Sequence, residues 1–514
     1  MVAIWFLLVW GGPARVVLVG GGAESDIGDP NGWSVAPYSA LLAGGDTNMD
    51  GEVRVVILGT NDQPSTFLTQ YFVWLGNLQM LNVTAFELPV PDRTAANAKS
   101  VREAVELADA LFIRGGDQGV YYDEWNDTAL DQAIHTVLNR GGSIGGTSAG
   151  SMSLAEFAFA GGRDLVSGDV LHDAHTPYLD DADGGSGIHN DFLSILPGIC
   201  IDSHFTWRGR LGRLAGILAK AEEDFQRFDL VGIGVEEKTA LVITGSQASV
   251  FGLGSALFLH RTNQTENVRI PGKPLIYTYL AAHRLVQGWR FDLLSRIVTP
   301  DGSAVPVPTL ALVPENNPWN PIMGDGESAA DQFEWKASWD PFSLTETQTL
   351  PTLYDSVGFG NAGASNNRGY KHESLWRALF DRPQLVGYLL WPGGQWISGD
   401  DPDFVYVSGG SGGIVVSLDT ASWMGLNSYF PSQNGVDFTA AFDQATLHVI
   451  GDTLGGTRFW YPRRRLLGLQ PNGAGLSLLI DYWGQNRPEL DIVQNGSIDV
   501  LDLAFLLSQF EANL

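Results

Sequence analysis

The first half of the chain alternates short apolar runs with longer amphipathic segments. Strands are predicted at 15–19, 53–59, 83–89 and 110–114, and helices at 64–80, 100–108 and 127–139, the last with Asp127 as its N-cap. Continuous apolar strands that alternate with amphipathic helices are typical of α/β proteins. The pattern therefore predicts a mostly parallel sheet with helices on both faces.

The second half has a different pattern. A stretch rich in Pro, Gly and Ser at 299–308 leads into a region where helical periodicity is weak. Short strands are predicted there at 404–407, 413–418 and 446–450. We therefore divide the chain into 1–14, an α/β domain at 15–298, a mostly β accessory region at 299–486 that could form a sandwich, and a tail at 487–514.

The N-terminal segment carries a nine-residue apolar run at 2–10, which is too short to span a bilayer. It resembles the apolar core of a secretory signal, although no Lys or Arg precedes it. A buried first strand is the alternative. No later segment is long and apolar enough to be transmembrane. We expect an extracellular or secreted protein, with the cytoplasm as the alternative.

Composition narrows the class of partner. The 514 residues include 58 acidic and 30 basic side chains, giving a net charge of −28. Nucleic acids attract basic proteins, so they are excluded as the main partner. The single cysteine, Cys200, excludes a disulfide framework and a metal site built from cysteines.

Candidate chemistry lies where the predicted strands end. Glycine clusters at 20–22, 115–116 and 145–150 follow strands, and in open α/β sheets ligands bind beyond the carboxyl ends of the strands. The third cluster contains Gly-Thr-Ser-Ala-Gly at 146–150, a G-x-S-x-G pattern. Such a turn exposes the Ser148 hydroxyl and frees the N–H of Ala149 for an oxyanion. A purely structural strand-to-helix turn is the alternative.

A serine nucleophile needs a base and an acid that orients the base. His204 follows the apolar run 195–201 and precedes three arginines. The acid could come from Glu236 or Glu237, which follow another apolar strand, or from Asp169. Spacing alone leaves these three open.

Four segments in order resemble the cyanophycinase family, serine peptidases of the S51 type. They are GGDQ at 115–118, GGTSAG at 145–150, IDSHFTWRGRLGRL at 201–214 and GIGVEEKTALV at 232–242. The resemblance implies an α/β fold like that of class I glutamine amidotransferases and no catalytic cofactor. It implies hydrolysis of cyanophycin, a poly-aspartate bearing arginine on each side-chain carboxyl, to β-aspartyl-arginine dipeptides through an acyl-enzyme.

The resemblance also assigns roles by position. It makes Ser148 the nucleophile, His204 the base and Glu237 the acid, with Gly116 and Ala149 as oxyanion donors. The positions that match its substrate pocket are Gln118, Asp202, Ser203, Arg208, Arg210 and Arg213. Ser203 stands where the family usually has Gln, which puts strict specificity for cyanophycin in doubt.

Two other functions stay open. The Ser203 departure is compatible with a peptidase for short acidic or isoaspartyl peptides. A non-catalytic extracellular binding or assembly protein is the third hypothesis. The acidic segment 172–189 could be a lid that attracts a cationic substrate, and a metal site from His172, His175 and His189 is less favoured than a solvated loop.

The tail resembles a degenerate dockerin-type calcium loop. Its oxygen ligands for Ca²⁺ would be Asp491, Asn495, Ser497, Asp499 and Asp502. Val493 replaces one expected ligand, and an ordinary turn before a terminal helix is the alternative. Such a tail could bind an assembly partner, and the protein could form a homodimer.

Overall fold

The computed structural model describes residues 15–61, 66–160, 165–179, 187–206 and 208–308, together with separate stretches between 356 and 503, of which 411–432 and 435–451 are the longest. Residues 1–14 and the five predicted calcium ligands lie outside the described residues. No helix in the described part of the chain is long and apolar enough to cross a membrane.

The first sheet has nine strands in the order β15-β14-β11-β10-β1-β5-β4-β2-β3. Its parallel half consists of β1 (Arg15–Val19), β5 (Ser143–Thr147), β4 (Ala110–Ile113), β2 (Glu52–Gly59) and β3 (Asn82–Pro89). Its antiparallel half consists of β10 (Thr239–Thr244), β11 (Gln247–Gly252), β14 (Arg290–Asp292) and β15 (Val298–Thr299). The sheet is thus mixed, and the expectation of a mostly parallel sheet holds only for strands β1 to β5.

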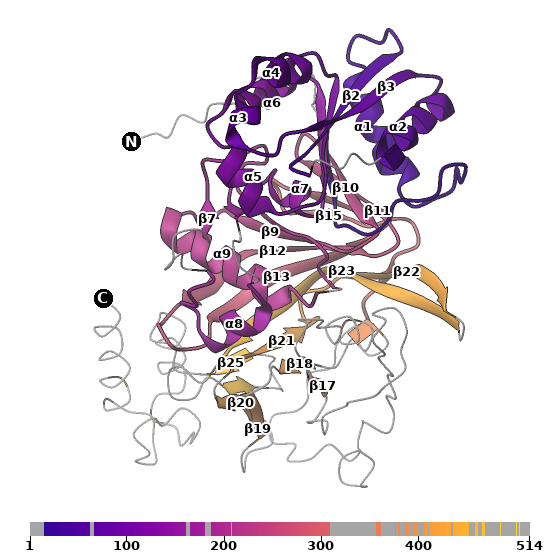
Figure 1. The fold of residues 1–514 in the computed structure, drawn as a ribbon. Coiled ribbons are helices and arrows are strands. Elements are labelled where there is room, and N and C mark those ends of the chain that lie inside the picture. Colours follow the sequence, from indigo (N-terminus) through magenta and orange to yellow (C-terminus); the bar gives the residue numbers. More distant parts are fainter. Residues whose placement is uncertain are drawn as a thin grey trace.

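Helices cover both faces of the parallel half, as the pattern predicts (Figure 1). On one face, α1 (Val35–Gly45) and α2 (Thr66–Gln79) pack on Val17, Ile57 and Phe112. The other face carries α3 (Arg93–Ala96), α4 (Lys99–Glu106), α5 (Gln118–Trp125), α6 (Ala129–Asn139) and α7 (Ala149–Met152). Alternating side chains of each strand therefore enter two separate cores.

The second sheet has ten strands and joins the two halves of the chain. Its main order is β17-β18-β21-β23-β13-β12-β9-β8. The strands from the first half are β8 (Ile199–Asp202), β9 (Val231–Val235), β12 (Ser255–Val268) and β13 (Ile276–Val286). Those from the second half are β16 (Val305–Pro306), β17 (Ser356–Gly360), β18 (Val386–Leu390), β21 (Gly413–Ser417), β22 (Trp423–Ser432) and β23 (Gly435–Ile450).

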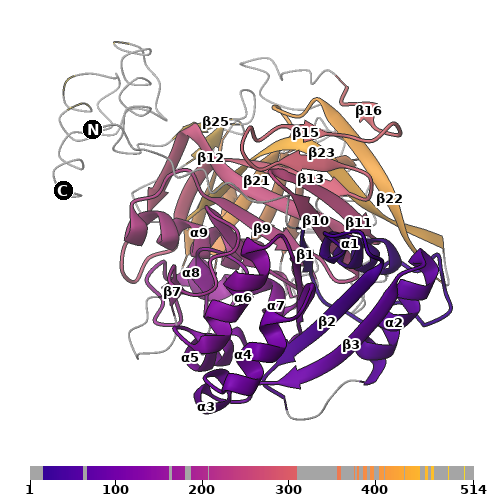
Figure 2. The same cartoon turned by 90° about the horizontal axis from the view of Figure 1, so that it is seen from above.

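The second half is β-rich, as expected, but the boundary placed at 299 runs through this continuous sheet. Strand β23 is hydrogen-bonded to β13, and the two lie side by side in both views (Figures 1 and 2). A separate four-stranded sheet contains β19 (Gly394–Ser398), β20 (Phe404–Gly409), β24 (Arg458–Trp460) and β25 (Arg465–Leu467), and β6 (Ala158–Phe159) pairs with β7 (Ile188–His189).

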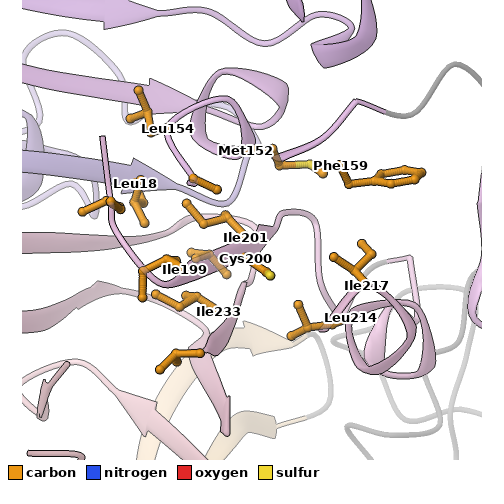
Figure 3. Packing of buried hydrophobic residues seen from close by; sticks show 14 of the residues in the cluster. Leu18, Met152, Leu154, Phe159, Ile199, Cys200, Ile201, Leu214, Ile217 and Ile233 are labelled. Atoms are coloured by element: carbon orange, nitrogen blue, oxygen red, sulfur yellow. The ribbon is translucent and has the colours of Figure 1, made fainter. Parts of the chain in front are cut away.

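One hydrophobic core lies between the two sheets. Leu18 of β1, Ile201 of β8 and Leu214 of α9 (Leu211–Phe225) all belong to it (Figure 3). The remaining helix, α8 (Ser167–His172), packs on α9 through Val170, which a side chain at Gly216 would strike. This shared core holds the ends of β1, β5, β8 and β9 in a fixed relation.

The N-cap expected for α6 is wrong, and the sequence pattern predicts neither the length of α7 nor helix α1. The N-cap of α6 is Thr128, whose side chain accepts a hydrogen bond from the N–H of Asp131, and Asp127 instead has a positive φ of 54°. The helix after the Ser148 turn, α7, is short and ends at Met152. The sequence pattern also does not predict helix α1, because its apolar side chains do not follow a clear helical period.

Candidate active site

Ser148 lies in a strained turn between β5 and α7. Its backbone has φ 55° and ψ −121°, which a residue with a side chain rarely adopts, and its N–H donates to the carbonyl of Val19. The flanking glycines are required by close packing. A Cβ on Gly146 would lie 2.4 Å from the backbone of Gly150, and one on Gly150 would lie 2.2 Å from the carbonyl of Ile113. The G-x-S-x-G pattern is thus a sharp turn that presents the serine hydroxyl.

Ser148, His204 and Glu237 form one hydrogen-bonded chain. The Oγ of Ser148 is 2.7 Å from Nε2 of His204, and Nδ1 of His204 is 2.6 Å from Oε1 of Glu237. The three side chains come from loops after β5, β8 and β9. This is the geometry of a nucleophile, a base and a group that orients the base.

The glycines after β1 hold the base and the acid together. The N–H of His204 donates to the carbonyl of Gly20, and the N–H of Lys238 donates to that of Gly21. Gly21 has φ 110°, and a Cβ there would lie only 2.3 Å from Cε1 of His204. Residues 20–21 therefore connect the two sheets and limit the space that the imidazole of His204 can occupy.

The environment keeps the imidazole neutral. Burial lowers the pKa of His204 from 6.5, and the charges of Arg208 and Arg210 lower it further, although the hydrogen bond to Glu237 opposes them. A neutral imidazole at pH 7 has an unprotonated nitrogen facing the Ser148 hydroxyl. It can therefore accept the serine proton.

Of the three acids that spacing left open, Glu237 is the one that contacts His204. Glu236 points away into the protein, where its carboxylate bonds to Ser255 and Arg284. Asp169 lies in α8 and accepts a hydrogen bond from the N–H of Val166.

The two predicted oxyanion donors flank the serine. Ala149 follows it directly, and the Cβ that Gly115 lacks would lie 3.4 Å from the Cβ of Ser148, which places the 115–116 turn beside the nucleophile. Within the described residues, no hydrogen-bond acceptor is found for the N–H of Gly116 or Ala149. Both groups can therefore point at a substrate oxygen.

The residues predicted to contact substrate form two groups, one that solvent can reach and one that is buried. Gln118 is half-buried at the start of α5, and Arg208 is exposed beside His204. Asp202 is fully buried, where its carboxylate lies 2.9 Å from Nη1 of Arg210 and 3.0 Å from Nε of Arg213. This buried ion cluster braces the start of the His204 loop.

Ser203 lies beside this cluster. It is 1% exposed, and its hydroxyl has no partner within the described residues. The short side chain of Ser203 therefore does not reach the solvent beside Ser148.

The structure also brings in residues that the sequence analysis missed. Arg284, near the end of the buried strand β13, is 2% exposed and bonds to Glu236. An arginine within a mostly apolar run is the signal that could have identified it, because a buried charge requires a partner. Its partners lie 48 and 156 residues away in sequence, so the spacing could not name them.

No cluster of three or more potential metal ligands occurs among the described residues. His189 stacks on Tyr122 with ring centroids 3.8 Å apart. His172 ends α8, and residues 180–186 of the predicted acidic lid lie outside the described part of the chain.

Comparison with known proteins gives the class of protein. Residues 77–251 match the model of peptidase family S51. The matched residues include Ser148, His204 and Glu237. The comparisons support the class predicted from the sequence, a serine-type peptidase.

The curated relatives that the chain matches include cyanophycinases. The chain is 30% identical to the cyanophycinase of Trichormus variabilis over 219 residues, which cover 41% of this chain and 66% of that protein. It is 27% identical to the cyanophycinase of Geminocystis herdmanii over 281 residues, which cover 54% of this chain and 93% of that protein. A solved peptidase from an acI-B1 Actinobacterium is 21% identical with a TM-score of 0.35, covering 55% of this chain and 97% of that one.

Proposed function

We propose that this protein is a serine hydrolase that cleaves cyanophycin to β-aspartyl-arginine dipeptides. The observation that carries the proposal is the hydrogen-bonded chain from Ser148 through His204 to Glu237 at a strained turn. The similarity to cyanophycinases supports the choice of substrate.

In the proposed reaction, Oγ of Ser148 attacks the scissile carbonyl carbon while Nε2 of His204 takes the serine proton. The carbonyl oxygen becomes an oxyanion that the N–H groups of Gly116 and Ala149 stabilise. Glu237 stabilises the imidazolium that forms. Collapse of the intermediate breaks the C–N bond, and His204 returns its proton to the leaving amine.

Water then attacks the Ser148 acyl-enzyme, and His204 takes its proton. The second collapse breaks the ester bond and restores the serine hydroxyl. Every proton moves through one imidazole, so the reaction requires no metal or organic cofactor. We infer from the sequence resemblance that the fold is related to class I glutamine amidotransferases, and the turn after β5 is compatible with that relation.

Substrate selection rests on charge. Cyanophycin carries carboxylates and guanidinium groups along one chain. Arg208, exposed beside His204, can attract a carboxylate, and the overall excess of acidic side chains favours approach of the guanidinium groups.

The test is product analysis on cyanophycin with the full chain. Wild-type protein should release β-aspartyl-arginine, identified by mass spectrometry. Ser148→Ala should lower that release to below about one thousandth, because a residue that acts with its partners as a unit accounts for most of the rate. Ser303→Ala, which removes an exposed serine in a turn, is the matched control.

A second function is favoured by Ser203. Its buried, short side chain leaves unfilled the contact that the family's usual glutamine would make. The enzyme could therefore accept short acidic or isoaspartyl peptides instead of the polymer. Cleavage of β-aspartyl dipeptides with intact cyanophycin would establish this alternative, and no hydrolysis of either substrate would favour a non-catalytic binding protein.

A further inference from the structure

One strand next to β13 in the second sheet comes from the C-terminal region of the chain. In the second sheet, β23 pairs antiparallel with β13, with Arg284 opposite Phe442 and Ala282 opposite Ala445. Strand β23 starts at Gly435 and is drawn in orange-yellow against the magenta strands (Figures 1 and 2). The C-terminal region thus extends the sheet that carries the His204 and Glu237 loops.

Arg284 spans this junction with one guanidinium group. Its Nη1 donates to the carbonyl of Ala440 in β23 at 2.7 Å, and its Nη2 donates to Oε1 of Glu236 at 2.8 Å. The ring of Trp376, also from the C-terminal region, lies 5.9 Å from its Cζ. A planar guanidinium presents its donors on separate nitrogens in a rigid fork, whereas a lysine carries all its donors on one nitrogen at the end of a flexible stem.

Glu236 is where this link meets the candidate site. It is 4% exposed, and its carboxylate accepts hydrogen bonds from the N–H of Ser255, the hydroxyl of Ser255 and the hydroxyl of Thr206. Thr206 lies two residues after His204, and Glu236 immediately precedes Glu237. One buried carboxylate therefore fastens both the loop of the base and the loop of the acid.

The charge on Glu236 depends on Arg284. Burial raises the pKa of Glu236, but the Arg284 charge and the hydrogen bonds from Thr206 and Ser255 outweigh burial and hold the pKa below its ordinary value. Without the arginine, this buried carboxylate loses the cation with which it forms an ion pair. It would then take up a proton or move, and either change breaks the set of hydrogen bonds.

We propose that Arg284 is a positioning residue of the active site, through which strand β23 of the C-terminal region keeps His204 and Glu237 in register. This inference rests on the proposed function. It makes the region after residue 299 part of the catalytic framework. The hydrolase activity then requires β23, whatever else that region binds.

The test compares two ion pairs in the full-length protein, each of which holds a buried glutamate. Arg284→Met removes the proposed link. Arg261→Met removes a pair of similar geometry, Nη1 of Arg261 to Oε2 of Glu222 at 2.7 Å, in which Glu222 is also fully buried. Arg261 lies in β12, and its guanidinium bonds to Glu222 and to the carbonyl of Thr265, apart from the hydrogen bonds around Glu236. Thermal unfolding of each variant sets a temperature at which both are folded.

At that temperature, kcat of Arg284→Met should fall by about ten- to a hundredfold with KM changed less than about threefold, because displacing a base by up to 1 Å has effects of this size. Arg261→Met should keep kcat within about threefold. Arg284→Lys keeps the charge but not the two-directional bonding, so it should fall between wild type and Arg284→Met. If Arg284→Met does not fold, the lysine variant takes its place.

A readout without turnover separates this inference from the proposed function. The proton shared between His204 and Glu237 should give a downfield imidazole N–H signal in ¹⁵N-histidine NMR of the full chain, and Arg284→Met should shift or abolish it. If wild type hydrolyses nothing but the signal responds to Arg284, the proposed function fails and the positioning role stands. If wild type is active and neither kcat nor the signal responds more to Arg284→Met than to Arg261→Met, the positioning role is refuted.

Discussion

Adding one methyl group at Gly21 should lower the activity of the enzyme strongly without unfolding it. A Cβ at this position would lie 2.3, 2.7 and 2.8 Å from Cε1, Nε2 and Nδ1 of His204. Non-bonded carbon atoms rest at about 3.5–4.0 Å, so the imidazole must retreat by roughly 1 Å. The 2.7 Å contact between Ser148 and His204 would then stretch beyond hydrogen-bonding range.

The expected loss in kcat/KM is about a hundredfold, the usual effect of misplacing a catalytic group by about 1 Å. Backbone strain must be separated from this effect, because Gly21 has φ 110° and alanine is disfavoured there by about 1–2 kcal/mol. Gly28 has φ 102°, and a Cβ added there would meet nothing within 4 Å, so Gly28→Ala carries the same strain without the collision.

The assay measures kcat/KM and urea unfolding for both variants. Both should lose similar free energy of unfolding, and only Gly21→Ala should lose activity. Equal activity in the two variants at equal folded fraction would refute the proposed place of His204 in the reaction.

Two predictions concern pH. Because burial lowers the pKa of His204, kcat/KM should rise with pH through a midpoint below 6.5, and an acid midpoint above 6.5 in the pH–rate profile would contradict this. Burial also lowers the pKa values of His283 and His448 to about 3. Between pH 6.5 and about 3 the unfolded chain therefore binds protons that the folded chain does not, so the free energy of unfolding should fall with falling pH by at most about 1.4 kcal/mol per unit for each histidine. His448→Asn, which keeps an acceptor for the N–H of Tyr279, should reduce that slope in chemical denaturation across this window, and an unchanged slope would show that His448 does not contribute.

Strands β1 to β4 and helices α2, α4 and α6 of the first half could be predicted from the sequence. The strand predicted at 15–19 is β1 to the residue, and the one predicted at 83–89 differs from β3 by one residue. Buried parallel strands are continuous apolar runs, so hydrophobicity alone marks them. Helix α1 and the short length of α7 could not be predicted in this way, because packing on the neighbouring strands decides them.

The candidate site, like the fold, could be predicted from the sequence only in part. The motif around Ser148 identified a sharp turn, because glycine, serine and alanine at that spacing suit few other structures. The fold decides which residues far apart in the sequence form hydrogen bonds with one another. Spacing left Glu236, Glu237 and Asp169 open, and the direction of each side chain after its strand decided that Glu237 meets His204.

The sequence by itself determined strands β1 to β4, helices α2, α4 and α6, the serine turn and the candidate base, because these depend on short-range periodicity and on residue types that a tight turn requires. The tertiary structure decided which acid contacts the base, that Asp202, Arg210 and Arg213 form a buried cluster, and that β23 joins the sheet beside Arg284. These contacts bring together residues far apart in the chain, and only the pairing of strands and the packing of the shared core fix which of them meet.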